Sequence, residues 1–236
     1  MFEARSAEIE KLDEADFSQM DACDSFKFIA SVNRWFGGVR IVKNYLLTQI
    51  AQLRRGKELK ILDIGCGICD IPLTLDRYFR DHGYDIAWDG LESNRHVAYL
   101  AIKNVLDEPA THVRVLHKNI FQFRPDYMYD FAIASMFFHH FNDHDIKHLI
   151  EQVRTFTRYG LLINDLHRSS AAWLGARFLT SLSAQVVRHD ACLSVQRGFR
   201  VAELNQMLRD LNITQFRVYR APFARVIAEI AFKRGG

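Results

Sequence analysis

Residues 60–70 combine glycines, cysteines and acids in an order that suits a nucleotide-like ligand. They read KILDIGCGICD, an apolar run with Asp63 that enters the turn Gly65-Cys66-Gly67 and is followed by apolar residues at helical spacing. A strand that passes through a glycine turn into a helix presents backbone N–H groups and a helix N-terminus to a ligand. This turn is therefore the first candidate binding site.

Acidic residues around the turn distinguish between two kinds of ligand. The dinucleotide-binding pattern G-x-G-x-x-G places its third glycine beside a bound pyrophosphate, whereas this chain has Asp70 there. A carboxylate repels a pyrophosphate but attracts an amino group or a sulfonium, and Asp63 supports the same choice. A further acid, Glu92, ends the next predicted strand, which suits an acceptor for ribose hydroxyls about 20 residues beyond the turn. The pattern favours a cationic nucleoside.

The order of these motifs resembles the class I S-adenosylmethionine-dependent methyltransferases. The matching segments are ILDIGCGICD, WDGLESN, VLHKNI and YDFAIASMFFHHF, which together extend over nearly the whole chain. The later segment LLINDLHRS is similar to a subgroup that methylates small molecules, often in polyketide or quinone-like pathways. Cys69 departs from the pattern, because the family usually has glycine or alanine there, but its side chain is also small.

This resemblance implies S-adenosyl-L-methionine as the cofactor. Its expected binding residues surround the turn, the end of the second strand and the segment after the third strand, with Ser135 bordering the site: Asp63, Gly65, Cys66, Gly67, Glu92, Asn119 and Ile120. The expected fold is an α/β Rossmann-like sheet of seven strands, mostly parallel with the last strand antiparallel and helices on both faces.

Periodicity in the chain supports this architecture, because apolar strand-like and helix-like segments alternate. The first strand begins at Lys60, and the others are expected at residues 85–91, 112–116, 129–135, 159–166, 213–219 and 225–232.

Two further apolar segments are expected near the carboxyl ends of the strands, where open α/β sheets bind ligands. They are a helical lid at residues 1–56, ahead of a methyltransferase domain at 57–236, and a substrate-cap insertion at residues 168–201. Residues 1–20 are expected to be loosely ordered, and residues 188–194 of the insertion to form a loop. The predicted substrate-binding residues are Arg34, Trp35, His139 and Trp173, with ordinary helix packing as the alternative.

Histidines at the predicted strand ends are candidates for proton transfer. Methyl transfer from a sulfonium needs an acceptor lone pair in line with the S–CH₃ bond and a dry site. A phenolic acceptor, with a pKa of about 10, must also lose its proton to a base. The candidate bases are His140, His167 and His189. A carbon acceptor that is already enolate-like would need less help.

Two groups of residues could instead suggest a metal or redox site. His140, His144 and His148 stand four apart and could share a helical face, but no carboxylate or cysteine is committed with them. Cys66 and Cys69 have CxxC spacing, but they lie inside the glycine turn, where small residues are needed. We therefore expect no metal.

Composition narrows the class of protein further. The 236 residues carry a formal net charge of only +3, with acids and bases interspersed, so no basic face for nucleic acid is indicated. No apolar run approaches the roughly 18 residues of a membrane span, and the acidic N-terminus lacks a secretory h-region. Four cysteines, two of them in the turn, favour a reducing, cytoplasmic compartment. The oligomeric state is left open.

The expected function is methylation of a small apolar or aromatic metabolite, at a hydroxyl oxygen. Three alternatives stay open: C-methylation of a quinone- or polyketide-like ring, methylation of a protein or RNA, and a catalytically silent protein that binds the cofactor and partners another enzyme. The absence of a basic groove and of an added recognition domain argues against a macromolecular substrate.

Overall fold

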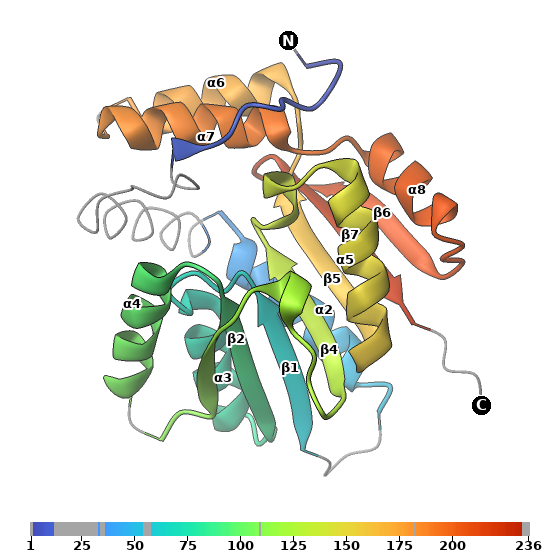
Figure 1. Cartoon of the computed structure of the whole chain (residues 1–236). Coiled ribbons are helices and arrows are strands. Elements are labelled where there is room, and N and C mark those ends of the chain that lie inside the picture. Colours follow the sequence, from blue (N-terminus) through green and yellow to red (C-terminus); the bar gives the residue numbers. More distant parts are fainter. Residues whose placement is uncertain are drawn as a thin grey trace.

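Figure 1 shows the computed structural model, in which seven strands form one sheet with helices around it. The structure describes residues 2–11, 33, 36–53, 58–108, 110–181 and 183–232. The predicted substrate-binding residues Arg34 and Trp35, and most of the first predicted helix of the lid, lie outside this part of the chain.

The sheet has the order β3-β2-β1-β4-β5-β7-β6. Its strands are β1 (Leu59–Ile64), β2 (Ile86–Glu92), β3 (Val113–His117), β4 (Tyr129–Ser135), β5 (Thr157–Leu166), β6 (Phe216–Ala221) and β7 (Arg225–Ala231). The first five strands pair in parallel, and β7 pairs antiparallel with both β5 and β6. The predicted Rossmann-like class with a reversed last strand is confirmed.

Helices cover both faces of the sheet, which explains why the central strands are almost wholly apolar. One face packs against α2 (Gly38–Ile50), α3 (Asp70–Asp81) and α4 (Arg95–Leu106), and the other against α5 (Asp143–Phe156) and α8 (Val201–Asp210). All seven residues of β4 are buried. The strand order reverses at β1: β2 and β3 lie on one side of it, and β4 and β5 lie on the other. In open α/β sheets, a ligand-binding crevice forms at the carboxyl end of the strands at such a reversal.

A pair of helices, α6 (Ser170–Leu179) and α7 (Gln185–Arg197), lies over this edge of the sheet (Figure 1). The prediction of a loop at residues 188–194 is wrong, because these residues belong to α7. The buried side of α7 carries polar residues, including Asp190, Ser194 and Arg197. A search for apolar periodicity cannot recognise a helix whose inner face is polar.

The N-terminal segment at residues 2–11 is not loosely ordered, which corrects the prediction for this part of the chain. It crosses α7 (Figure 1), and Arg168 donates hydrogen bonds from Nε to the Phe2 carbonyl at 3.1 Å and from Nη2 to the Glu3 carbonyl at 3.2 Å. The backbone N–H of Ser6 donates to the Gln196 carbonyl at 3.1 Å. These contacts come from distant residues, so the segment's own sequence does not reveal them.

Among the described residues, no helix has both the length and the apolar character needed to cross a membrane.

Candidate functional site

A cavity of about 760 Å³ lies at the carboxyl ends of the central strands, beneath α6 and α7. Asp63 of β1, Glu92 of β2 and Ser135 of β4 reach its wall from the sheet. Leu179 and Ser194 reach it from the two helices above. The cavity thus joins the predicted cofactor turn to the predicted cap.

The glycine turn is held next to Glu92. Gly65 has a φ of 67° and Gly67 a φ of 55°, a region in which an L side chain is strained. The Glu92 carboxylate accepts hydrogen bonds from the backbone N–H of Gly67 at 3.2 Å and of Asn94 at 2.8 Å. A Cβ on Gly65 would lie 2.1 Å from Cδ2 of Phe137, so only glycine fits beneath that ring.

Three acids at this end of the cavity have pKa values above their ordinary range. Burial raises the pKa of Asp63 well above its usual value, and the nearby charges of Asp70 and Glu92 raise it further. Burial also raises the pKa of Glu92, and it raises that of Asp70 to about 6. A cation placed among these acids would stabilise their ionised forms, so the geometry suits a positively charged ligand better than a phosphate.

A smaller hollow of about 80 Å³ lies on the other side of the glycine turn. The predicted residues Asn119 and Ile120 line it, together with Phe121. Asn119 accepts a hydrogen bond from the Phe121 backbone N–H at 2.9 Å, which starts the short helix η2 (Ile120–Gln122). Phe137 lines both the hollow and the main cavity, so the two spaces are neighbours.

A buried histidine–carboxylate pair lies across the cavity from the turn. His139 is in the short helix η3 (Phe138–His140) after β4, and its Nδ1 lies 2.6 Å from Oδ1 of Asp165, near the end of β5. Burial alone would raise the pKa of Asp165, but the charge and hydrogen bond of His139 bring it below its ordinary value. An ionised carboxylate can only accept, so Nδ1 of His139 carries the proton of this hydrogen bond. The other ring nitrogen, Nε2, lies 3.6 Å from Oε1 of Glu10.

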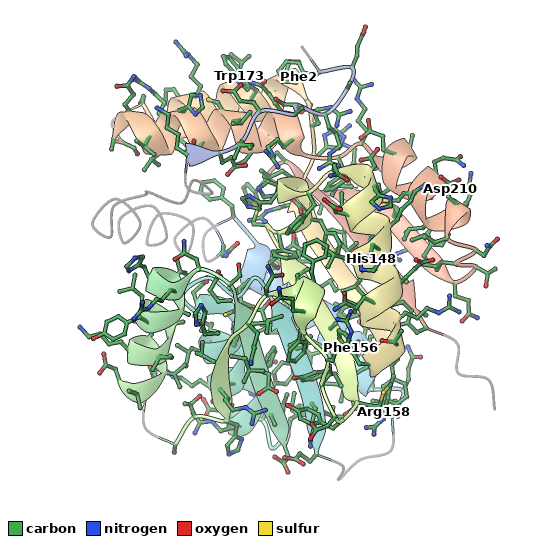
Figure 2. The ribbon with its side chains drawn as sticks, viewed as in Figure 1. Phe2, His148, Phe156, Arg158, Trp173 and Asp210 are labelled. Carbon is green, nitrogen blue, oxygen red and sulfur yellow. The ribbon has the colours of Figure 1, made fainter. Side chains whose placement is uncertain are left out.

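Some of the predicted site residues line the described wall of the cavity and others do not. His139 and His140 line it, whereas His167 and His189 are not among the described residues of its wall. Trp173 lies on α6 (Figure 2) and is not on the described wall either; it packs beside Leu166, Ala172 and Val195. The predicted cofactor residues that line the cavity are Asp63, Gly65, Cys66, Gly67, Glu92 and Ser135.

The predicted histidine face does not form. His140 lies in η3, and α5 begins only at Asp143, so His144 and His148 are on a different element from His140. His148 projects from α5 (Figure 2), where its ring stacks on Phe121 with 6.2 Å between ring centroids.

Several charged residues on the cavity wall were not predicted from the sequence, and two of them are almost fully buried at its edge. Glu10, in the N-terminal segment, is 3% exposed, and Arg225, at the start of β7, is 1% exposed. Burial lowers the pKa of Arg225 to about 10. Neither residue lies in a motif of the glycine-turn type. The sequence gives no local signal for either residue, because their burial follows from the tertiary structure.

A model of the protein family described as tellurite resistance protein TehB matches residues 48–169, just over half of the chain. The chain belongs to this family. The matched residues of this TehB-family protein include the glycine turn, Glu92, the η3 histidines and Asp165. A search of curated protein sequences gives no significant match.

Solved structures share the fold of this TehB-family protein. The plantazolicin methyltransferase BpumL in complex with SAH has a TM-score of 0.68 at 15% identity, covering 93% of this chain and 92% of the other. The magnesium protoporphyrin IX methyltransferase ChlM from Synechocystis PCC 6803 with bound SAH has a TM-score of 0.59 at 14% identity, covering 93% and 89%. A putative O-methyltransferase from Nostoc punctiforme PCC 73102 has a TM-score of 0.66 at 12% identity, covering 94% and 64%. The resemblance to class I methyltransferases is confirmed in family and fold.

The cysteines of the turn in this TehB-family protein fill space beneath the sheet. Their sulfur atoms lie 3.3 Å apart and both residues are buried. The hydrogen bond to Cys69 and burial raise the pKa of Cys66 well above its usual value, which disfavours a reactive thiolate. A Cβ on Gly90 of β2 would lie 2.6 Å from Sγ of Cys69 and 2.8 Å from Sγ of Cys66. The cysteines therefore pack as small residues against a strand glycine.

Opposite effects on stability are expected for two Gly→Ala changes. Gly90→Ala should lower the free energy of unfolding by about 1–3 kcal/mol, because the added methyl group overpacks the two sulfurs. Gly175→Ala, in the exposed middle of α6 with open space around it, should raise it by about 0.5–1 kcal/mol through helix propensity. Urea unfolding measures both changes. Equal effects of the two substitutions would contradict the packing described around Gly90.

Proposed function

We propose that this TehB-family protein transfers a methyl group from S-adenosyl-L-methionine to a small apolar or aromatic metabolite, at a hydroxyl oxygen. The observation that carries the proposal is the group of buried acids around the glycine turn, which opens directly into a cavity with apolar walls. A cavity of about 760 Å³ falls within the range of roughly 300–1,000 Å³ that small-molecule and cofactor sites occupy.

The residues of the turn suit each part of the cofactor. Glu92 projects at the end of β2, where its carboxylate can accept hydrogen bonds from both ribose hydroxyls. Asp63 and Asp70 provide negative charge for the amino group and the sulfonium. The hollow lined by Asn119, Ile120 and Phe121 offers an apolar slot for the adenine ring. When bound, the cofactor supplies an electrophilic methyl group on a positively charged sulfur.

The rest of the cavity would hold the methyl acceptor. Aromatic and aliphatic side chains line it from several elements: Phe36, Phe137, Phe141, Leu166, Leu179 and Phe223. Such walls exclude water and favour a flat or apolar guest. Residues 168–201 supply α6 and α7, so we keep the interpretation of this insertion as the substrate cap.

His139 is the best placed base among the described histidines of the site. Asp165 fixes its ring and its tautomer, which leaves the Nε2 lone pair available to take the acceptor proton. The oxygen would then attack the methyl carbon in line with the departing sulfur. Because the sulfonium loses its charge in this step, the protein mainly has to position the partners and exclude water. The other candidate on the wall, His140, is a quarter exposed, and its Nδ1 lies 4.0 Å from Oε2 of Glu10.

Incubation of the protein with methyl-labelled cofactor and a metabolite extract tests the proposal directly. We expect label in a small-molecule product, and mass spectrometry of that product distinguishes an O-methyl from a C-methyl group. Calorimetry should show binding of S-adenosyl-L-methionine and none of NAD. Binding of NAD alone, or of neither compound, would contradict the proposal, whereas cofactor binding without turnover would favour the silent-partner alternative.

A pH dependence of cofactor affinity is expected from Asp70. Its pKa of about 6 means that the carboxylate is mostly neutral at pH 5 and mostly ionised at pH 7. Affinity for the cationic cofactor should therefore rise by up to about tenfold over this interval. Calorimetry at pH 5, 6 and 7 measures the effect. In Asp70→Asn the profile should flatten; an unchanged slope in that variant would assign the effect to Asp63 or Glu92 instead.

In the absence of ligand, the same carboxyl group affects stability with the opposite sign. The folded-state pKa of Asp70 is raised above the unfolded value of about 3.9, so the folded protein binds more protons between these two values. The contribution of Asp70 to stability is therefore fully present below about pH 4 and is lost as the pH rises through about 6.

A further inference from the structure

Three side chains with metal-binding atoms meet on the wall of the cavity. Glu10, His139 and His140 each offer one donor atom, and these atoms all lie within 4.8 Å of one another. Nε2 of His139 is 3.6 Å from Oε1 of Glu10, and Nδ1 of His140 is 4.0 Å from Oε2 of the same carboxylate. All three residues line the cavity, so the space between them opens toward the acceptor region.

One oxygen of the buried Glu10 carboxylate has no hydrogen-bond partner among the described residues. This oxygen is Oε1, and the residue is 3% exposed. Nε2 of His139, at 3.6 Å from this oxygen, is too far away for a hydrogen bond. Burying a carboxylate in this way costs several kcal/mol, on the order of the desolvation of one ion, unless a counter-charge is present. The arrangement therefore points to a positive partner between Glu10 and the histidines.

Contacts on both sides of Glu10 hold it in this place. Arg197 of α7 donates a hydrogen bond to the Glu8 carbonyl, and Asp190 accepts one from the Lys11 backbone N–H at 3.1 Å. Arg197 also donates from Nε to the His139 carbonyl at 2.9 Å. One arginine thus ties the segment that carries Glu10 to the helix that carries the histidines.

His139 also has a carboxylate at its second ring nitrogen, as metal-binding histidines commonly do. Its Nδ1 is held by Asp165 at 2.6 Å, which directs Nε2 toward Glu10. Carboxylate–histidine–metal arrangements of this kind fix the tautomer and raise the basicity of the ligand nitrogen. Asp165 is fully buried, and it also accepts hydrogen bonds from the backbone N–H groups of His139 and Leu166.

We propose that Glu10, His139 and His140 bind one divalent transition-metal ion of the zinc type. Two imidazole nitrogens and one carboxylate form the His₂Glu set found in zinc sites that keep a position open. Atoms bound at about 2.0–2.2 Å to a tetrahedral ion lie roughly 3.2–3.6 Å apart, so the 3.6 Å and 4.0 Å separations need only small side-chain movements to close. Mg²⁺ and Ca²⁺ prefer oxygen ligands and fit the set poorly.

Because the three side chains line the cavity, an ion held by them would be accessible to an acceptor hydroxyl. A metal ion and a proton cannot share Nε2 of His139, so the ion-loaded protein would not use His139 as a base. The metal inference depends only on the three side chains and not on the proposed methyl transfer.

Calorimetric titration of the chelator-treated full chain with ZnCl₂ tests this inference. With no methyl donor or acceptor present, the result is independent of whether the protein is a methyltransferase. We expect one ion per chain, with affinity reduced at least tenfold in Glu10→Gln and in His140→Ala. Asp165→Asn should reduce it by about 10–100-fold, the usual effect of removing a carboxylate that supports a ligand histidine.

Matched controls come from residues outside the cluster. His144→Ala and His148→Ala remove exposed imidazoles on α5 and should leave zinc binding unchanged. Circular dichroism of each variant checks its fold, and the visible absorption of added Co²⁺ reports on the coordination geometry in the unmodified chain. The absence of saturable binding in the wild-type protein would overturn the inference. So would binding that Glu10→Gln and His140→Ala leave intact, including binding that is lost instead on Cys66→Ala.

Discussion

Glu92→Ala is expected to weaken binding of S-adenosyl-L-methionine by about a hundredfold or more. The carboxylate is placed to accept hydrogen bonds from two ribose hydroxyls, each worth about 1.5–3 kcal/mol when one partner is charged, and about 3 kcal/mol corresponds to a hundredfold change in affinity. Glu92 also accepts from the Gly67 N–H at 3.2 Å, so its removal loosens the turn as well. Isothermal titration calorimetry measures the change.

Two further variants separate these contributions. Glu92→Gln keeps an acceptor for the Asn94 N–H but turns an amide N–H₂ toward Gly67, so we expect an intermediate loss of affinity. Glu108→Ala removes an acid that is paired with Arg77 on the surface and should bind the cofactor normally. Unchanged affinity in Glu92→Ala would remove the ribose assignment and with it the strongest link between the sequence motif and the cofactor.

Replacement of His139 by alanine is expected to lower the turnover rate by about 10²–10⁴-fold, the range typical of a lost general base. Cofactor affinity should change little, because the acids of the turn are intact. Steady-state and single-turnover kinetics of chelator-treated protein with a labelled cofactor provide the measurement. The use of metal-free protein keeps the proton-transfer role of His139 separate from metal binding.

Variants of the other histidines, and of Asp165, test whether a loss of turnover rate is specific to His139. His167→Ala and His189→Ala should have mild effects, since neither residue is on the described cavity wall. Burial and nearby arginines lower the pKa of His167, while the His189 side chain is 38% exposed and lies 3.3 Å from Glu8. Asp165→Asn should lower the rate because it weakens control of the His139 tautomer. Mild effects for all of these changes, His139 included, would favour carbon methylation or a reaction without a base.

Most of the cofactor region could be predicted from the sequence because its determinants are local. The strand, turn and helix at residues 60–81 are contiguous, and Glu92 follows at the end of the next strand. The predicted strand boundaries at 129–135 match the structure, and the others agree to within a few residues. Apolar runs buried on both faces can be recognised wherever they occur in the chain.

The composition of the acceptor side could not be predicted in the same way. Glu10 meets His139 only because Arg168, Arg197 and Asp190 draw the N-terminal segment across α7. Several histidines follow the ends of strands, so position along the sequence alone does not distinguish which of them is the base. Which ring faces the cavity depends on Asp165, two residues from His167 in sequence but bonded to His139 in space.

By itself, the sequence determined the fold class, the family resemblance and the acidic turn that favours a cationic nucleoside, because each depends on neighbouring residues and on a repeating period. Only the tertiary structure decided which histidine is held by a buried acid, that residues 188–194 form a helix, and that Glu10 enters the site. The physical reason is that these features depend on polar contacts between distant segments. Such contacts leave no periodic signal in the chain.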